Sequence, residues 1–208
     1  MRGKFITIEG QDGAGKSTNV AAMQEYLTVK GVDFIHTREP GGTSLGENIR
    51  ELLLNSSGEI ADKTELLMMF AARAQHIEYV IEPALNQGKW VLCDRFTDAT
   101  YAYQGSGRGL GFDGIKLLEA YVQEGLTPDL TLLLDLPIEV SEDRAGQRSA
   151  PDRFEKQKHD FKQKVRDCYL SRAGQEPHRI KVVDASQSLT QVKESVLLTL
   201  NEFCEPYV

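Results

Sequence analysis

Apolar residues along this chain follow two alternating patterns, short continuous runs and longer stretches with helical spacing. The short runs cover residues 4–9, 33–38, 90–94, 130–135 and 179–184. They are rich in β-branched and large apolar residues, and most are bounded by Gly, Pro or Asp, which is typical of strands. The run at 130–134 is almost wholly apolar, as expected of a parallel strand buried on both faces.

Helical spacing fills the intervals between these runs. Val20, Met23 and Leu27 share one helical face, residues 66–85 form a long candidate helix, and apolar residues recur every four positions from 192 to 200. Strands that alternate with helices predict a doubly wound α/β fold, with one parallel five-stranded sheet and helices on both faces. No repeat, low-complexity tract or linker divides the sequence, so we expect a single domain over residues 1–208.

Composition narrows the class of protein. The 208 residues are 40% hydrophobic and 26% charged, and no apolar run approaches the roughly 18 residues of a membrane span. The net charge of −7 disfavours binding along a nucleic-acid backbone. Cys93, Cys168 and Cys204 are far apart and lack metal-ligand spacing, so we expect free or buried thiols and a cytoplasmic protein.

A glycine-rich loop between the first predicted strand and the first predicted helix is the strongest chemical signal. It fits the pattern G-x-x-x-x-G-K-[ST] and consists of Gly10, Gln11, Asp12, Gly13, Ala14, Gly15, Lys16 and Ser17. The glycines let successive backbone N–H groups point at phosphate oxygens, and the helix N-terminus adds a positive partial charge. Lys16 suits the β- and γ-phosphates, Ser17 suits Mg²⁺, and Thr18 completes the predicted ATP-binding loop.

Charged residues also follow the second and third predicted strands. The stretch TREPGGT occupies residues 37–43, with Arg50 a turn or two into the next helix, and the third strand ends in Asp94 and Arg95. A carboxylate at the end of an apolar strand suits Mg²⁺, and a guanidinium binds phosphate oxygens bidentately. Three alternatives stay open: an ordinary turn at 37–43, a helix cap or ion pair at Asp94, and Asp135 as the metal ligand.

Four stretches together resemble the thymidylate kinases of bacteria. They are the loop at 10–17 preceded by Glu9, TREPGGT at 37–43, FAARAQH at 70–76 and DRFTDATYAYQGSGRG at 94–109. The resemblance extends from about residue 3 to about residue 158. It implies a P-loop nucleoside-monophosphate kinase fold with a short lid, a homodimer, and transfer of a phosphoryl group from ATP to dTMP with Mg²⁺. From the net charge and the lack of a long apolar run, we expect no nucleic-acid polymer and no membrane as a partner.

The resemblance also implies a dTMP site. Its members are Asp12, Arg38, Glu39, Pro40, Arg50, Met69, Phe70, Arg73, Arg95, Thr100, Tyr103 and Gln104. Three of the arginines, at positions 38, 50 and 95, are expected around the 5′-phosphate, and Asp12 near the sugar 3′-OH. Arg73 and Gln104 are expected at polar edges of thymine. Met69 stands where the family usually has an aromatic residue, so either it or Phe70 is expected against the thymine ring, with core packing as the alternative.

A second basic segment, residues 143–158, follows the fourth predicted strand. Gly and Pro interrupt it, which favours a lid over a continuous helix, a solvated loop being the alternative. Since the loop at 10–17 contains no arginine, the resemblance implies that lid arginines neutralise the transferred phosphoryl group. We therefore expect Arg148 or Arg153 to act in catalysis beside Lys16 and Arg95, and Arg144 to lie near the adenine.

Two other functions stay open at this point. Another P-loop kinase, acting on a different mononucleotide or small acid, would share residues 10–17 but not the stretches at 70–76 and 94–109. A nucleotide-binding switch would hydrolyse ATP slowly and without response to dTMP. The sequence has no Asn-Lys-x-Asp stretch for guanine and no Leu-Ser-Gly-Gly transporter signature. The four histidines are expected to be structural or exposed, because an acceptor phosphate that is already anionic needs no general base.

Overall fold

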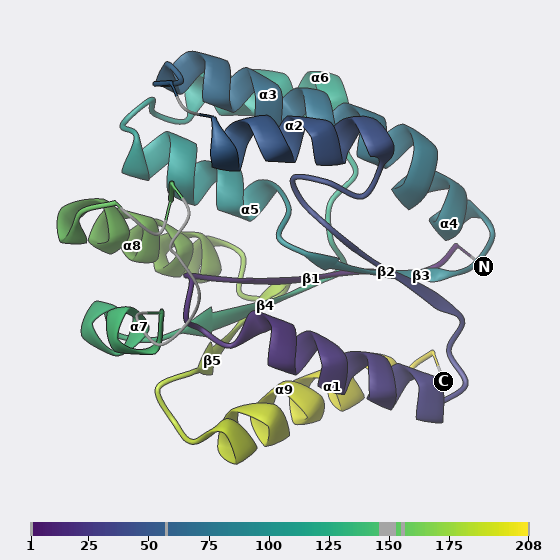
Figure 1. Cartoon of the computed structure of the whole chain (residues 1–208). Helices are drawn as coiled ribbons and strands as arrows, with labels where there is room; N and C mark the ends of the chain where they lie inside the picture. The colour runs from purple at the N-terminus through teal and green to yellow at the C-terminus, as the bar shows by residue number, and fades with distance from the viewer. Residues whose placement is uncertain (1, 57, 146–152, 155–156, 208) are drawn as a thin grey trace.

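The computed structural model describes residues 2–56, 58–145, 153–154 and 157–207. Within these ranges strands alternate with helices along the chain (Figure 1). The strands are β1 (Phe5–Gly10), β2 (Phe34–Arg38), β3 (Trp90–Asp94), β4 (Leu130–Asp135) and β5 (Ile180–Asp184). The helices are α1 (Lys16–Val29), α2 (Ser44–Asn55), α3 (Asp62–His76), α4 (Glu82–Asn86), α5 (Thr97–Thr100), α6 (Asp113–Gln123), α7 (Ile138–Ala145), α8 (His159–Gln175) and α9 (Leu189–Cys204), with π-helical turns η1 (Ile77–Ile81) and η2 (Tyr101–Gly107).

All five strands form one parallel sheet in the order β2-β3-β1-β4-β5, which confirms the predicted fold class. The predicted strand bounds differ from the observed ones by one residue at most. The register sets Asp94 opposite both Ile8 and Arg38, so that the carboxyl ends of β1, β2 and β3 share one edge. In open sheets of this kind, ligands bind outside that edge.

Helices cover both faces of the sheet (Figure 1). Helices α1 and α9 pack on the face that carries Ile6, Ile8 and Leu132. Helices α3, α4, α6 and α8 lie over the opposite face, against neighbouring strand residues such as Phe5 and Leu133. Successive strand residues point to opposite faces, which is why a continuous apolar run supplies both cores.

The single helix predicted over residues 66–85 is wrong in its interior. Helix α3 ends at His76, a π-helical turn follows, and α4 begins at Glu82. Pro83 in the first turn of α4 explains the interruption: its nitrogen carries no hydrogen for the helical hydrogen bond, and its ring crowds the preceding turn.

The three cysteines are buried and free of disulfide bonds, and no helix in the described ranges is both long enough and apolar enough to cross a membrane.

Candidate active site

The glycine-rich loop joins β1 to α1 at the carboxyl edge of the sheet. Gly13 and Gly15 have φ values of 84° and 85°, a left-handed conformation that side chains with a Cβ rarely adopt. The ammonium of Lys16 donates to the carbonyl oxygens of Gly10 (3.0 Å) and Gln11 (3.1 Å). Ser17 and Thr18 are exposed in the first turn of α1. The loop therefore presents a cation, a hydroxyl and a helix N-terminus on one side.

Asp12 connects this loop to the residues that follow β3. Its Oδ1 accepts a hydrogen bond from Arg95 Nη2 (2.7 Å) and lies 3.7 Å from Lys16 Nζ. Burial opposes ionisation of Asp12, but Arg95 and Lys16 outweigh it and lower the pKa of this carboxyl. Burial, and then the repulsion of Arg95, lowers the pKa of Lys16.

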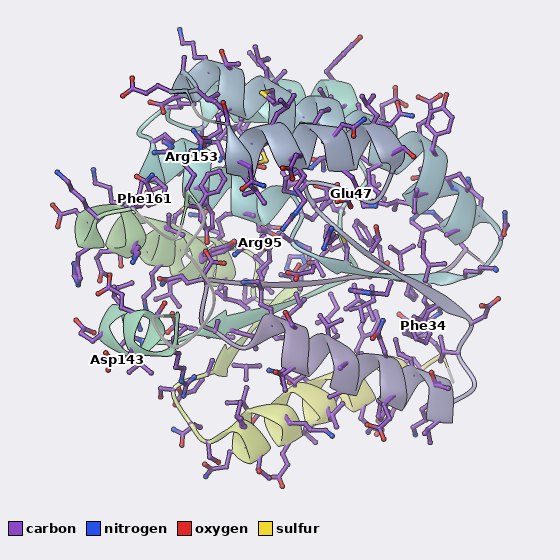
Figure 2. All side chains as sticks on the ribbon, in the orientation of Figure 1. Phe34, Glu47, Arg95, Asp143, Arg153 and Phe161 are labelled. Atoms are coloured by element: carbon purple, nitrogen blue, oxygen red, sulfur yellow. The ribbon has the colours of Figure 1, made fainter. Side chains whose placement is uncertain are left out.

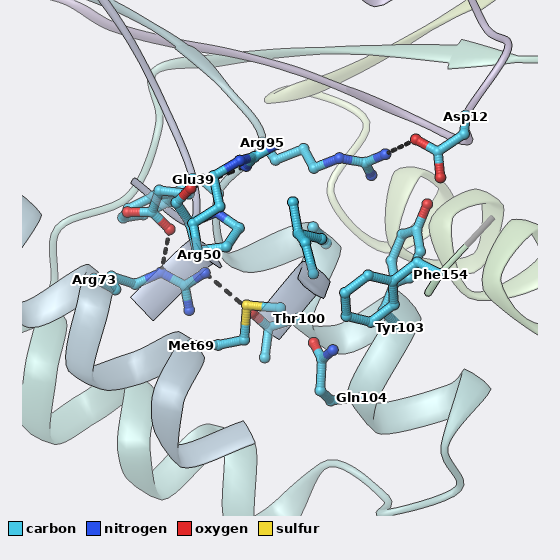
Figure 3. Close-up of a pocket in the computed structure, with 14 residues that line it drawn as sticks. Asp12, Glu39, Arg50, Met69, Arg73, Arg95, Thr100, Tyr103, Gln104 and Phe154 are labelled. Atoms are coloured by element: carbon cyan, nitrogen blue, oxygen red, sulfur yellow. Dashed lines mark hydrogen bonds and ion pairs between the residues drawn. The ribbon is translucent and has the colours of Figure 1, made fainter. Parts of the chain in front are cut away.

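A cavity opens beside Asp12 (Figure 3). It is lined by Asp12, Glu39, Pro40, Arg50, Leu54, Met69, Arg73, Arg95, Phe96, Ala99, Thr100, Tyr103, Gln104 and Phe154. The set includes every residue of the predicted dTMP site except Arg38 and Phe70. Residues from all four of the stretches named above, together with Arg50, Leu54, Met69 and Phe154, thus meet in one hollow at the carboxyl edge of the sheet.

Arg73 is held rigidly at the end of the cavity that also contains Thr100. Its Nε donates to Glu39 Oε2 (2.7 Å), and its Nη2 donates to Thr100 Oγ1 (3.0 Å). Its guanidinium lies 4.8 Å from the ring centre of Phe70 and 5.1 Å from that of Phe96. The remaining nitrogen, Nη1, is buried and has no partner among the described residues. Arg73 therefore offers one donor without a partner beside the cavity.

Met69 lines the cavity (Figure 3), whereas Phe70 is not among its lining residues. Phe70 is buried in a core cluster with Tyr101 and lies against the Arg73 guanidinium. Only one of the two lines the cavity because adjacent residues on a helix point about 100° apart. The role of Phe70 in this structure is to pack against Arg73.

The sequence reasoning missed what Glu39 does for its neighbours. One carboxylate oxygen binds Arg73, and the other lies 2.9 Å from Nδ1 of His76. Nε2 of the same histidine lies 2.6 Å from Thr37 Oγ1. Gly42 passes so close that a Cβ there would lie 2.4 Å from His76 Nε2, so this position requires glycine. His76 is structural, as expected, and Glu39 positions Arg73.

Arg38 and Arg50 have different hydrogen-bond partners in this structure. Arg38 is exposed and pairs with Glu47 of α2 (2.8 Å) outside the cavity lining. Arg50 lines the cavity and donates to the carbonyl oxygen of Pro40 (3.0 Å). Burial, and then the repulsion of Arg38, lowers the pKa of Arg50, so an anion beside it would relieve both effects.

Arg95 has a φ of 69°, an uncommon conformation for a residue other than glycine. Its backbone is anchored on both sides: its N–H donates to the Ile8 carbonyl (3.0 Å), and the N–H of Phe96 donates to Glu9 Oε1 (2.7 Å). Its guanidinium lies 5.0 Å from the ring centre of Tyr103 and reaches Asp12. This backbone directs the side chain across the cavity towards the glycine-rich loop (Figure 3).

Asp94 and Asp135 differ in their surroundings. Oδ1 of Asp94 is buried and has no hydrogen-bond partner in the described part of the chain. Asp135 accepts two hydrogen bonds from Arg166, at 2.8 and 2.9 Å. Both carboxylate oxygens of Asp135, the alternative metal ligand, are thus engaged by Arg166. Asp94 has one oxygen without a partner among the described residues. Among the described residues no three His, Cys, Asp or Glu side chains cluster as a metal site.

Glu9 is wholly buried below the glycine-rich loop and binds the hydroxyl of Tyr169 (2.8 Å). Burial, and then the charge of Asp98, raises the pKa of Glu9 to about 7 from an ordinary value of 4.5. The folded state therefore holds this proton more tightly than the unfolded state does. This proton contributes about 3 kcal/mol to the free energy of unfolding. The contribution is complete below pH 4.5 and is lost as the pH rises to about 7.

Replacing Glu9 by glutamine removes this titration. We expect urea unfolding to show a smaller loss of stability between pH 5 and pH 8 for Glu9→Gln than for the unmodified protein, by about 3 kcal/mol or less. The exposed Glu205→Gln serves as the control, since it removes a carboxyl outside the core. Equal pH dependence in Glu9→Gln and the unmodified protein would contradict the raised pKa of Glu9.

The predicted lid is described only in part. Arg148 lies outside the described residues. Arg144 donates to the carbonyl oxygens of Ala185 (2.7 Å), Ser186 (3.3 Å) and Gln187 (3.3 Å), and so ties α7 to the loop after β5. Arg153, beside α3 in Figure 2, pairs with Glu65. One of the two arginines expected at the γ-phosphate, Arg153, is therefore bound to a buried carboxylate at the cavity end that contains Gln104.

The cavity contains four residues that sequence reasoning did not assign, Leu54, Phe96, Ala99 and Phe154. Phe96 and Ala99 belong to the stretch at 94–109, whose resemblance to thymidylate kinases could have indicated that they line the cavity. Tyr101 from that stretch packs in the core, whereas Tyr103 lines the cavity. Leu54 comes from α2 and Phe154 from the segment predicted as a lid, and no local sequence pattern indicates that either would line the cavity.

Comparison with known proteins gives one consistent family. The family described as Thymidylate kinase matches residues 8–196. A thymidylate kinase of Pseudomonas entomophila is 57% identical over 197 residues, which cover 94% of both chains. One from Ectopseudomonas mendocina is 56% identical over 208 residues (98% of this chain, 99% of the relative), and one from Alcanivorax borkumensis is 53% identical over 203 residues (97% and 98%).

Proposed function

Because the chain belongs to the thymidylate kinase family and phosphorylates dTMP to dTDP with ATP, we propose that dTMP binds in the cavity beside Asp12. The observation that carries this proposal is Nη1 of Arg73, a buried donor without a partner in the described ranges. A carbonyl oxygen of a pyrimidine would satisfy it. Gln104 and Thr100 line the same end of the cavity, and Met69 offers an apolar surface for the ring.

The phosphate of dTMP then lies at the end of the cavity that contains Arg50 and Arg95. Both side chains line the cavity, and both guanidiniums can bind phosphate oxygens through two parallel hydrogen bonds. Arg95 also contacts Asp12 in the glycine-rich loop, so one side chain adjoins the acceptor and the donor sites. Arg38 joins this set if its exposed ion pair with Glu47 opens when the phosphate arrives.

ATP would lie over the glycine-rich loop, with its β- and γ-phosphates at Lys16 and the loop amides. Arg144 already binds three carbonyl oxygens of the loop after β5, which supports an adenine site between α7 and that loop. Ser17 and Asp94 would hold Mg²⁺, since one is an exposed hydroxyl and the other has a buried oxygen without a partner among the described residues. The ion supplies charge neutralisation on the phosphates.

The residues of this chain position the reactants and supply charge. An oxygen of the dTMP phosphate forms the new bond to the γ-phosphorus of ATP, and the bond to the β-phosphate oxygen breaks, leaving ADP. The acceptor oxygen is already anionic, so no side chain has to remove a proton. Lys16, Arg95 and a lid arginine, Arg148 or Arg153, neutralise the charge on the phosphoryl group, and the closed lid excludes water.

We further propose one kinase domain over residues 1–208 with a lid at 143–158, a cytoplasmic location and a homodimer. Apolar side chains exposed on α2, α3 and α6 support the homodimer, because a second copy would bury them. They are Leu45, Leu52, Leu67, Leu117 and Tyr121.

Replacing Arg50 by alanine tests the assignment of the acceptor cavity. Loss of a charge-assisted contact to phosphate is expected to raise KM for dTMP by about tenfold to a hundredfold, with little change in KM for ATP. A coupled assay of ADP release with dTMP, dUMP, dCMP and dGMP measures this. The surface variant Arg2→Ala is the control for removal of an arginine.

The same assay separates the remaining alternatives. A kinase for another mononucleotide would prefer another acceptor in the panel, and a nucleotide-dependent switch would release ADP slowly whichever acceptor is present. An unchanged KM for dTMP in Arg50→Ala would refute the cavity as the acceptor site.

A further inference from the structure

Glu65 lies in α3 beside the end of the cavity that contains Gln104, and it is fully buried. Its carboxylate accepts hydrogen bonds from Nε2 of Gln104 (2.8 Å) and from Arg108 (3.1 and 3.2 Å), and it also pairs with Arg153. The two arginines compensate the charge of Glu65, which is why this carboxylate can be buried.

The Glu65 contact fixes which end of the Gln104 amide faces the cavity. A carboxylate can only accept hydrogen bonds, so the group that faces it must be the NH₂ of the amide. Oε1 is therefore turned away from Glu65, and Gln104 lines the cavity (Figure 3). Oε1 accepts no hydrogen bond from the residues that the structure describes. Flipping the amide would put its oxygen against the carboxylate in a buried site.

The fixed oxygen of Gln104 stands with the fixed donor of Arg73 in one cavity. Nη1 of Arg73 can only donate, and Glu39 and Thr100 prevent the guanidinium from turning. Thymine matches this pair of groups. Its ring N3–H would donate to Oε1 of Gln104, and the adjacent carbonyl oxygen would accept from Nη1 of Arg73. Cytosine offers the reverse, an unprotonated N3 next to an amino group. A cytosine base would fit only if the Gln104 amide reversed.

We propose that Glu65 is a specificity-determining residue, which holds the amide of Gln104 so that the site accepts a pyrimidine with a ring N–H and rejects cytosine. This inference rests on the proposed binding of dTMP in the cavity. Glu65 acts through Gln104 and does not line the cavity itself. It is therefore a positioning residue, and its effect is on the choice of base.

Replacing Glu65 by glutamine tests this role, because an amide at position 65 can donate or accept and so permits both orientations of Gln104. We expect the ratio of kcat/KM for dTMP to kcat/KM for dCMP to fall by about tenfold or more. The fall must include a gain of activity on dCMP. A smaller change, or a fall caused only by loss of activity on dTMP, overturns the proposal.

A matched variant removes one of the two arginine partners of Glu65. Arg108→Gln breaks the ion pair but leaves the Gln104 contact intact, so its ratio of dTMP to dCMP activity is expected to stay that of the unmodified enzyme. If Glu65→Gln alone does not fold, Glu65→Gln/Arg108→Gln removes the charge together with one of its two arginine partners and decides the same question. Thermal unfolding of each variant checks that it is folded.

Gln104→Ala separates failure of this inference from failure of the proposed function. If KM for dTMP does not rise in Gln104→Ala, dTMP does not bind in this cavity and both proposals fail. If it rises while Glu65→Gln keeps the original preference for dTMP over dCMP, only the role of Glu65 is refuted.

Discussion

Replacing Lys16 by methionine is expected to lower kcat by about a thousandfold or more while leaving the affinity for dTMP unchanged. In the structure the ammonium donates to the carbonyl oxygens of Gly10 and Gln11, within the loop that would hold the phosphates of ATP. Methionine keeps an unbranched side chain, one atom shorter than that of lysine, and removes the charge and the donors. Coupled assays give kcat, and calorimetric titration gives the affinity for dTMP.

Folding is not expected to limit this experiment. Burial and the repulsion of Arg95 lower the pKa of Lys16, so the folded protein already disfavours its charge. The variant should therefore unfold within a few degrees of the unmodified protein. Lys193→Met, at an exposed position of α9, is the control. If Lys16→Met retained a tenth of the original kcat, Lys16 would not act on the transferred phosphoryl group.

The parts of this fold that depend on local pattern could be predicted from the sequence. The strands and α1 are marked by runs of apolar residues and by glycine, and the five predicted strands match the structure to within one residue. The π-helical turn before α4 was not predicted because apolar spacing continues through it. Pro83 was the local signal for that interruption.

The parts of the site that depend on convergence of distant residues could not be predicted in the same way. Glu65 contacts Gln104, Arg108 and Arg153, which follow it in the sequence by 39, 43 and 88 residues. Resemblance pointed to residues that line the cavity, but not to the buried carboxylate that orients them. The net charge of −7 likewise says nothing about a small cationic site, because only the tertiary fold gathers Arg50, Arg73 and Arg95 around one cavity.

Replacing Arg95 by alanine is expected to lower kcat/KM for dTMP by about a thousandfold, since this residue would bind the acceptor phosphate and neutralise charge in the transition state. Its guanidinium reaches Asp12 at 2.7 Å, so its loss also frees a carboxylate beside Lys16. Arg95→Lys keeps the charge without the planar fork and should recover only part of the activity. The exposed Arg2→Ala is the control for loss of a positive charge.

Glycine at position 95 separates the backbone from the side chain. Because φ is 69° there, alanine keeps the strained conformation while glycine adopts it freely, and Glu9 holds the next N–H in either variant. Arg95→Gly should therefore be more stable than Arg95→Ala by about 1 kcal/mol, yet equally inactive. Urea unfolding and kcat/KM for dTMP measure the two effects. Activity in Arg95→Gly within tenfold of the unmodified enzyme would mean that the backbone, and not the guanidinium, carries the function of this position.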